Sequence, residues 1–225
     1  MTDRIVSTDY HDYVIKDGHL IGDFEGMYKH SKEIPWHQDL ADKCIHSRLF
    51  LELISQHRPY NTVCEIGCGL GYFTEMVYHN LKPAIVTGFD ISPTAINSAK
   101  DRTKNRGCEI SFKQMDITKE CFGKYDCVIL KDIMWYIYPN LHKVLDNLTT
   151  MLSKGGFIFV EQAFPPNKDY VGKETIESPD HLRDIFSARF ELVFFGVMRA
   201  KESNFESVAY LVLINKNSIF SKGET

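Results

Sequence analysis

The chain has 225 residues, of which 44% are hydrophobic and 25% charged, and its formal net charge is −4. This length suits a single α/β domain with a sizeable core, and the slight negative charge gives no reason to expect a nucleic-acid partner. The sequence contains no apolar run of about 18 residues for a membrane span and no signal-peptide layout at its N-terminus. We therefore expect a cytoplasmic protein without a membrane partner.

The cysteines indicate neither a disulfide framework nor a metal centre. There are six of them, Cys44, Cys64, Cys68, Cys108, Cys121 and Cys127. They form no C-x-x-C pair, and no histidines stand at the spacing of zinc ligands. We expect reduced, structural thiols and predict no metal site.

The first 44 residues do not read as part of a sheet. Aromatic and apolar residues alternate with charged ones there, namely Tyr10, Tyr13, Phe24, Met27, Tyr28 and Trp36. We expect a short extended piece and then one or two helices that lie over a ligand. Pro35 favours an extended Ile34, which places Trp36 at a chain reversal. Two roles are open for Trp36: packing onto the core, or contact of its indole with a ligand.

Residues 39–57 carry apolar side chains at helical spacing, and Pro59 follows as a stop signal. This segment is predicted to be one helix. Arg48 lies within it, either as a solvated cation on the helix face or as a ligand contact.

A glycine-rich turn follows the predicted strand Thr62–Ile66. Gly67, Gly69 and Gly71 alternate, and a helix is expected from Tyr72 to about residue 81. Such a turn between a strand and a helix makes a nucleotide site. The dinucleotide fingerprint needs a third glycine where Tyr72 stands. Glu65, at the end of the strand, would repel a pyrophosphate and suits the cationic amino-acid end of S-adenosylmethionine.

Acidic residues also follow the next three predicted strands. The strand over 84–89 ends at Asp90, about 20 residues after the glycines, where an acid binds ribose hydroxyls. The strand over 109–115 precedes Asp116, which could alternatively cap the turn at Thr118. The strand over 125–130 precedes Lys131 and Asp132. Ligands of open α/β sheets bind outside the carboxyl ends of the strands, so we expect the chemistry at this edge.

The remaining elements complete the predicted sheet. A helix over 141–152 leads through Gly155 and Gly156 into a strand over 157–161, and a further helix ends near residue 187. The long loop at 163–180 is expected to roof an acceptor pocket. Strands over 190–197 and 208–214 are spaced as a terminal hairpin.

The run Cys64-Glu65-Ile66-Gly67-Cys68-Gly69-Leu70-Gly71 resembles the first motif of class I S-adenosylmethionine (SAM)-dependent methyltransferases, and the resemblance extends over residues 45–215. It implies an α/β, Rossmann-like sheet of seven mostly parallel strands in the order 3-2-1-4-5-7-6, with the last strand antiparallel. Helices are expected on both faces, and a helical lid at the N-terminus. The implied units are a lid at 1–44, a methyltransferase domain at 45–215 and a tail at 216–225.

The similarity to small-molecule methyltransferases of the nodulation N-methyltransferase kind implies SAM as cofactor and S-adenosylhomocysteine (SAH) as product. In such enzymes an arginine of the helix after the lid holds the SAM carboxylate, and an acid after the third strand accepts from the adenine amino group. The resemblance implies cofactor contacts from Trp36, Arg48, Glu65, Gly67, Gly69, Gly71, Asp90, Ile91, Asp116, Ile117 and Leu130.

These features together predict a methyltransferase that moves a methyl group to a nitrogen or oxygen of a small molecule by in-line displacement. A sugar, a polysaccharide precursor or a secondary metabolite would be the acceptor. Asp132 is the predicted residue that orients or deprotonates it, with Tyr136 as the second catalytic candidate. Weaker candidates are Trp135, His37 and Glu161.

Three questions stay open at this point. Lys131 would suit an anionic acceptor if it faced the pocket, and the sequence does not fix its direction. The alternatives to a methyltransferase are an NAD(P)-dependent oxidoreductase and a non-catalytic, SAM-binding regulatory subunit. The oligomeric state is also open, a homodimer included.

Overall fold

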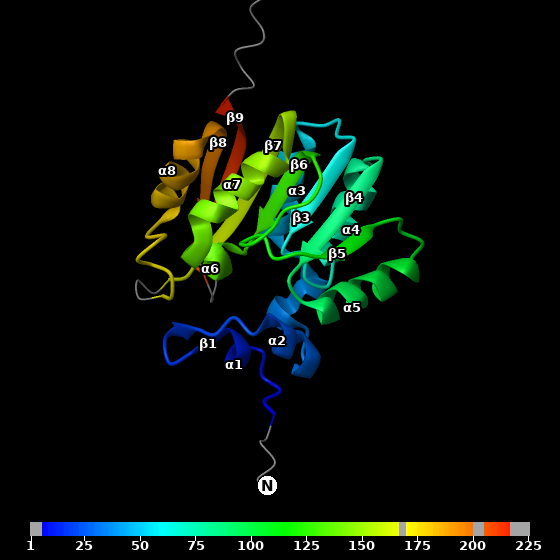
Figure 1. Cartoon of the computed structure of the whole chain (residues 1–225), viewed down its shortest axis with the longest axis vertical. Helices are drawn as coiled ribbons and strands as arrows, with labels where there is room; N and C mark the ends of the chain where they lie inside the picture. The colour runs from blue at the N-terminus through cyan, green and yellow to red at the C-terminus, as the bar shows by residue number, and fades with distance from the viewer. Residues whose placement is uncertain (1–5, 167–169, 200–204, 217–225) are drawn as a thin grey trace, which may run out of the picture.

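A central sheet of seven strands organises the chain, in the order β5-β4-β3-β6-β7-β9-β8 (Figure 1). The computed structural model describes residues 6–166, 170–199 and 205–216. The strands are β3 (Thr62–Ile66), β4 (Ile85–Asp90), β5 (Ser111–Gln114), β6 (Tyr125–Lys131), β7 (Leu152–Phe164), β8 (Phe190–Arg199) and β9 (Ser207–Asn215). Because β9 runs antiparallel to both of its neighbours and the other strands are parallel, the predicted order and directions are confirmed.

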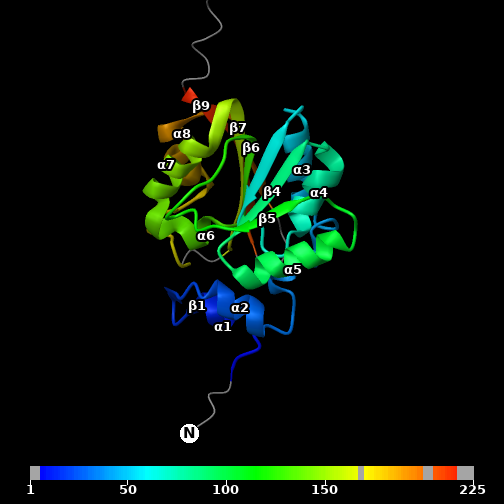
Figure 2. The ribbon, with the colours of Figure 1, turned by 45° about the vertical axis from the view of Figure 1, so that its right-hand side comes forward.

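Helices cover both faces of this sheet (Figure 2). They are α3 (Ile45–Ser55), α4 (Tyr72–Leu81), α5 (Pro93–Lys104), α6 (Met134–Ile137), the 3₁₀ turn η2 (Tyr138–Asn140), α7 (Leu141–Met151) and α8 (Pro179–Arg189). Val63 of β3 packs into the core under α3 and α4, and its neighbour Cys64 packs into the core under α7 and α8. Strands buried on both faces are apolar throughout for this reason. Among the described residues, no helix has the length and apolar character to cross a membrane.

Two helices begin at the carboxyl edge of the sheet. α4 starts directly after Gly71, which has a φ of 75°. α5 starts at Ser92, whose hydroxyl accepts the Ala95 N–H at 3.1 Å, with Pro93 in the first turn. Both are common helix starts, and they direct the positive ends of two helices toward this edge.

The N-terminal segment crosses the carboxyl edge of the sheet, where it is drawn in blue below the strands (Figures 1 and 2). It contains α1 (His11–Val14), a hairpin of β1 (Ile15–Lys16) and β2 (His19–Leu20), α2 (Phe24–His30) and a 3₁₀ segment η1 (Pro35–Leu40). Glu25 of α2 accepts hydrogen bonds from the Ser92 hydroxyl at 2.6 Å and from the Thr94 N–H at 3.1 Å. We call residues 6–44 the lid, because they are fastened to α5 across the edge.

Several boundaries differ from those expected. The single helix over 39–57 is two segments, and α3 begins only at Ile45. In the first segment, η1, Trp36 and His37 have left-handed φ angles of 52° and 49°, which kink the chain there. β5 is shorter than predicted, and β7 is longer because it pairs with β9 as far as Phe164. The proposed domain limits stay a prediction, and most of the expected tail lies outside the described residues.

Candidate functional site

A cavity of about 890 Å³ lies at the carboxyl edge of the sheet, between the lid and the strand ends. Its volume is in the range of small-molecule sites. Most of the predicted site residues line it, namely Trp36, Glu65, Gly67, Asp90, Ile91, Asp116, Ile117, Asp132 and Tyr136. The parallel strands bring them together, because β3, β4, β5 and β6 all end at this edge.

The glycine turn forms the floor of the cavity. Gly67 and Gly69 have φ angles of 74° and 52°, in the left-handed region that favours glycine. A Cβ on Gly67 would lie 2.4 Å from the Ile133 side chain. Neither Gly69 nor Gly71 lines the cavity, so these two glycines shape the turn and Gly67 faces the ligand space.

Glu65 places a buried carboxylate beside this turn. The Thr74 hydroxyl donates to its Oε2, and Glu65 is only 4% exposed. Burial raises the pKa of Glu65 to about 7. A cationic ligand group would hold the carboxylate ionised, and the residue therefore suits an ammonium.

Asp90 stands at the end of the neighbouring strand β4. Its Oδ2 accepts the Gly69 N–H at 2.8 Å, and its Oδ1 accepts the Ser92 N–H at 2.9 Å. Burial raises the pKa of Asp90 to about 6, against these hydrogen bonds. Each carboxylate oxygen has a second lone pair, so the pair of oxygens can also accept from two ligand hydroxyls.

Asp116 and Ile117 follow the next strand, β5. The Asp116 carboxylate accepts from the Thr118 N–H at 3.0 Å and pairs with Lys119 at 2.8 Å. Burial would raise the pKa of Asp116, but the bonds from Lys119 and Thr118 hold it below its usual value. The local capping role is thus present in the structure, and the adenine contact stays a prediction. Ile117 and Ile91 add apolar wall to this part of the cavity.

Lys131 points at two carboxylates of its own chain. Its Nζ lies 2.9 Å from Asp132 Oδ2 and 2.9 Å from Glu161 Oε1, because the pairing of β6 with β7 places Lys131 opposite Glu161. Burial would lower the pKa of Lys131, yet the two carboxylates raise it above its usual value. The charge of this lysine is therefore matched within the protein, and it is not free for an anionic ligand.

Asp132 is held in a fixed position on the cavity wall. Its φ is 53°, and its Oδ1 accepts the Ala163 N–H at 2.8 Å. Burial would raise the pKa of Asp132, but the Lys131 ammonium holds it below its usual value. Glu161 behind it is fully buried, and burial raises the pKa of Glu161 to about 7 in spite of Lys131. Asp132 is thus the acid of this group that stays ionised and lines the cavity, and the paired Lys131 lines it beside Asp132.

Aromatic rings form the opposite wall. Trp36 lies 5.7 Å from Tyr10 and 5.5 Å from Tyr136 between ring centroids, and Phe24 lies 5.1 Å from Tyr136. Three of these four rings come from the lid. Burial and the nearby Asp132 raise the pKa of the Tyr136 hydroxyl, which is therefore neutral.

Backbone strain is concentrated around this cavity. Of the described non-glycine residues with positive φ, Trp36, His37 and Asp132 line it, whereas Asp17 and Lys82 do not. Residues held in this region cost of order 1–3 kcal/mol each and gather at functional sites. His37 joins the wall through this strained turn. Trp135 has a structural contact, since its Nε1–H donates to the Ala163 carbonyl at 3.0 Å.

Two more of the predicted cofactor contacts do not line the cavity, and their roles stay predictions. Arg48 is exposed on α3 and does not line the cavity, because the helix turns its neighbours His46 and Ser47 inward instead. Leu130 is fully buried in the core beneath the site.

The described part of the loop at 163–180 does not roof the cavity. In its described part only Ala163 lines the space, and residues 167–169 lie outside the description. The cover comes from the lid and from Phe205 before β9.

Gln38 is a site residue that the sequence did not indicate. Its Oε1 accepts the Leu70 N–H of the glycine turn at 2.9 Å, and its Nε2 donates to the Tyr28 hydroxyl at 2.9 Å. Both side chains line the cavity. The lid is thereby attached to the glycine turn as well as to α5, and no local sequence signal marks such a contact.

Comparisons with known proteins agree with this architecture. Residues 63–156 match the family model described as a methyltransferase domain. Carboxy-S-adenosyl-L-methionine synthase of Campylobacter lari is 21% identical over 132 residues, which cover 58% of this chain and 56% of that protein. Malonyl-[acyl-carrier protein] O-methyltransferase of Paenibacillus sp. is 29% identical over 111 residues, 47% of this chain and 39% of that protein. The chain thus spans about half or less of these relatives.

A solved structure matches over most of both chains. The N-methyltransferase NodS from Bradyrhizobium japonicum WM9, in complex with S-adenosyl-L-homocysteine, has a TM-score of 0.63 at 20% identity, over 82% of this chain and 90% of that chain. At this identity the likeness concerns the fold. The structural likeness shows that the chain has the fold of class I, SAM-dependent methyltransferases, and the methyltransferase-domain match at residues 63–156 lies within that fold.

Proposed function

We infer that this chain binds SAM and transfers its methyl group to a nitrogen or oxygen of a small-molecule acceptor. The observation that carries the proposal is the row of acids Glu65, Asp90 and Asp116 along one cavity, at the ends of the adjacent strands β3, β4 and β5. The row matches an extended ligand with an amino-acid end, a ribose and an adenine, in that order. The methyltransferase match over residues 63–156 supports the same reading.

The chemistry of the cavity walls fits this cofactor. Glu65 offers a buried carboxylate to an ammonium, and Asp90 offers two oxygens to the ribose hydroxyls. Ile91 and Ile117 provide apolar surface near Asp116 for the base. Gly67 leaves room at the floor, because a side chain there would collide with Ile133. An NAD(P)-dependent oxidoreductase fits less well, since a pyrophosphate would meet the Glu65 carboxylate.

When bound, SAM supplies an electrophilic methyl group on a sulfonium. The protein's contribution is to hold the acceptor in line with it, which alone accounts for a large rate gain. Asp132 faces the cavity as a carboxylate and would accept a hydrogen bond from an acceptor N–H or O–H. Its lowered pKa makes it better suited to orienting the acceptor than to removing a proton. The neutral Tyr136 hydroxyl can donate or accept beside it.

The charges around Asp132 limit the acceptor class. Lys131 is already paired with Asp132 and Glu161, so this group offers no unpaired cation to bind a phosphate or carboxylate of the acceptor. On the opposite wall of the cavity, the rings of Tyr10 and Trp36 are aromatic and neutral. A neutral or cationic acceptor, such as an amine or a sugar hydroxyl, fits this environment better than an anion.

Calorimetric titration with SAM and SAH tests the proposal, with NAD⁺ as the competing ligand. Binding of SAM and SAH that is lost in Asp90→Ala is expected, and the matched surface variant Asp101→Ala should bind as the wild type does. Binding of NAD⁺ and not SAH would refute the cofactor assignment. Conversion of SAM to SAH with a neutral or cationic acceptor would then separate an enzyme from a non-catalytic SAM-binding subunit.

A further inference from the structure

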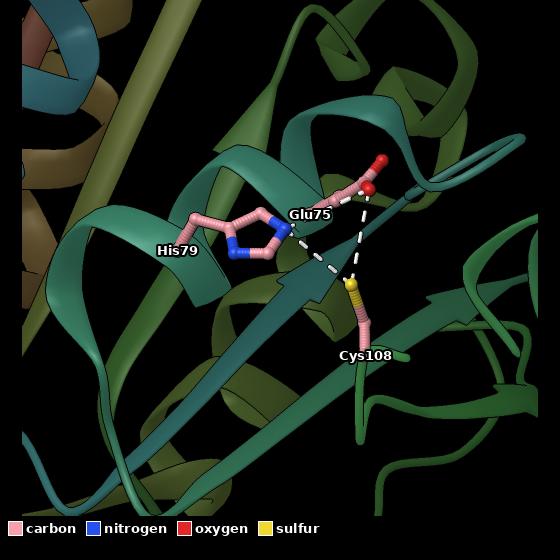
Figure 3. A group of neighbouring side chains, drawn as sticks. All are labelled: Glu75, His79 and Cys108. Atoms are coloured by element: carbon pink, nitrogen blue, oxygen red, sulfur yellow. Dashed lines mark hydrogen bonds and ion pairs between the residues drawn. The ribbon is translucent and has the colours of Figure 1, made fainter. Parts of the chain in front are cut away.

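A second cluster of reactive side chains lies away from the cavity. Glu75 and His79 are four residues apart on α4 and therefore share one face of that helix. Cys108 approaches them from the connection between α5 and β5 (Figure 3). Glu75 and Cys108 are buried, whereas the His79 side chain is 56% exposed. Nothing in the proposed methyl transfer uses these three residues.

The spacing of the three ligand atoms matches a tetrahedral metal site. Cys108 Sγ lies 3.4 Å from His79 Nε2 and 3.8 Å from Glu75 Oε1, and these last two atoms are 3.7 Å apart. Zinc bonds of about 2.0–2.3 Å to nitrogen, oxygen and sulfur require ligand separations of about 3.3–3.6 Å. Shifts of a few tenths of an ångström would therefore bring all three atoms into contact with one ion.

Arg102 holds the Glu75 carboxylate in the orientation that such a site needs. Its Nη1 donates to Glu75 Oε2, which leaves Oε1 directed at His79 and Cys108. Arg102 is itself fixed, because its Nε donates to the Leu70 carbonyl at 3.0 Å and its guanidinium stacks 4.0 Å from the Tyr72 ring. A hydrogen-bonded carboxylate ligand of this kind is usual in metal sites.

A second arginine, Arg106, would repel a cation at this site. Arg106 Nη1 lies 3.2 Å from Glu75 Oε1, the oxygen that a metal would take. The Arg106 side chain is 59% exposed, so it can move into solvent when an ion enters. Its charge lowers the affinity of the site without blocking it.

We propose that Glu75, His79 and Cys108 form a site for a thiophilic divalent cation such as Zn²⁺, with water as the fourth ligand. A cysteine, a histidine and a carboxylate suit zinc. On binding, the Cys108 thiol gives its proton to solvent and its sulfur bonds the ion as a thiolate. The ion would join α4 to the segment before β5, one turn behind the glycine turn.

Cobalt titration of the reduced, full-length protein tests the site, because Co²⁺ reports thiolate ligation by charge-transfer absorption and tetrahedral geometry by its d–d bands. We expect both signals at one equivalent, and their loss when Zn²⁺ is added. Cys108→Ser should lose the charge-transfer band, and His79→Ala should bind at least ~10-fold more weakly. The matched variants Cys121→Ser and His142→Ala should titrate like the wild type.

Arg106→Gln supplies a test in the opposite direction. Removal of its charge should tighten cobalt binding, whereas Arg48→Gln, at an exposed position on α3, should leave binding unchanged. His79 is exposed, so His79→Ala keeps the proposal testable should the Cys108 variant fail to fold. Absence of the bands in the wild type, or persistence of the charge-transfer band in folded Cys108→Ser, would overturn the proposal.

Discussion

Replacement of Glu65 by glutamine should stabilise the free protein and weaken its binding of SAM at the same time. Burial raises the pKa of Glu65 from 4.5 to about 7. A carboxyl group whose folded pKa is raised contributes stability below its unfolded pKa, and that stability is lost as the pH rises through the folded value. Above pH 7 the ionised carboxylate therefore costs the free protein roughly 3 kcal/mol at most.

Thermal unfolding without ligand measures the first half of this prediction. At pH 8, Glu65→Gln should raise the melting temperature by up to about 6–12 °C, on a scale of about 2–4 °C per kcal/mol for a protein of this size. Near pH 5 most of this gain should be lost, because the carboxyl of the folded wild type is then protonated, and below about pH 4.5 it should vanish. The exposed Glu120→Gln serves as the matched control and should show no such pH-dependent gain.

Calorimetry with SAH measures the second half. If the ligand ammonium pairs with Glu65 as we propose, it requires the ionised carboxylate, so wild-type affinity should fall below about pH 7 and approach a tenfold loss per pH unit. At pH 8, Glu65→Gln loses a hydrogen bond between charged groups, about 1.5–3 kcal/mol or roughly 10- to 150-fold in affinity. As the pH falls, the affinity of the Glu65→Gln variant should then stay constant until Asp90, with a pKa of about 6, becomes protonated. A wild-type affinity that is equal at pH 8 and pH 5.5 would refute the reasoning.

Three further variants test the floor, the wall and the lid of the cavity. Gly107→Ala, with a φ of 70° and open space around it, should lower the unfolding free energy in denaturant titrations by the backbone cost alone, about 1–3 kcal/mol. Gly67→Ala should lower it by more than that and abolish SAH binding, because its Cβ also meets Ile133 at 2.4 Å. Asp132→Asn should reduce turnover by about 10²-fold, the cost of a misplaced acceptor, with SAH affinity within twofold of the wild type, and full turnover would contradict its role. Glu25→Gln should speed SAH dissociation about tenfold in stopped flow, because the lid loses charge-assisted hydrogen bonds to α5; an unchanged rate would mean that the lid does not gate the cofactor.

The sheet and one side of the site could be predicted because their signals are local. Each of β3, β4 and β5 has an acid at its carboxyl end, either within its last two residues or two residues beyond it, and parallel pairing places those ends at one edge. Glu65, Asp90 and Asp116 therefore line one cavity as expected. The glycines made the tight turn after β3 predictable, because only a residue without a side chain fits at Gly67.

The other side of the site depends on contacts that no local pattern encodes. The direction of Lys131 follows from the register of β6 on β7, which brings Glu161 opposite to it. Spacing alone could not show that Arg48 lies outside the cavity, because its direct neighbour on α3, Ser47, lines the wall. The left-handed turn that begins at Trp36 has no sequence signature either, because a bulky residue other than glycine rarely adopts a positive φ.

The attachment of the lid has a consequence for the order of binding. Gln38 is bonded to the glycine turn at Leu70, and Glu25 is bonded to the first turn of α5. These two backbone segments flank Asp90, whose own oxygens accept from Gly69 and Ser92. A cofactor seated on Asp90 therefore rests against the same structure that holds the lid, and its binding should strengthen the closed arrangement.

The aromatic wall of Tyr10, Phe24 and Trp36 belongs to that lid, so the acceptor subsite is complete only when the lid is closed. We accordingly expect the cofactor to bind first and the acceptor second, and product inhibition by SAH should be competitive with SAM and non-competitive with the acceptor.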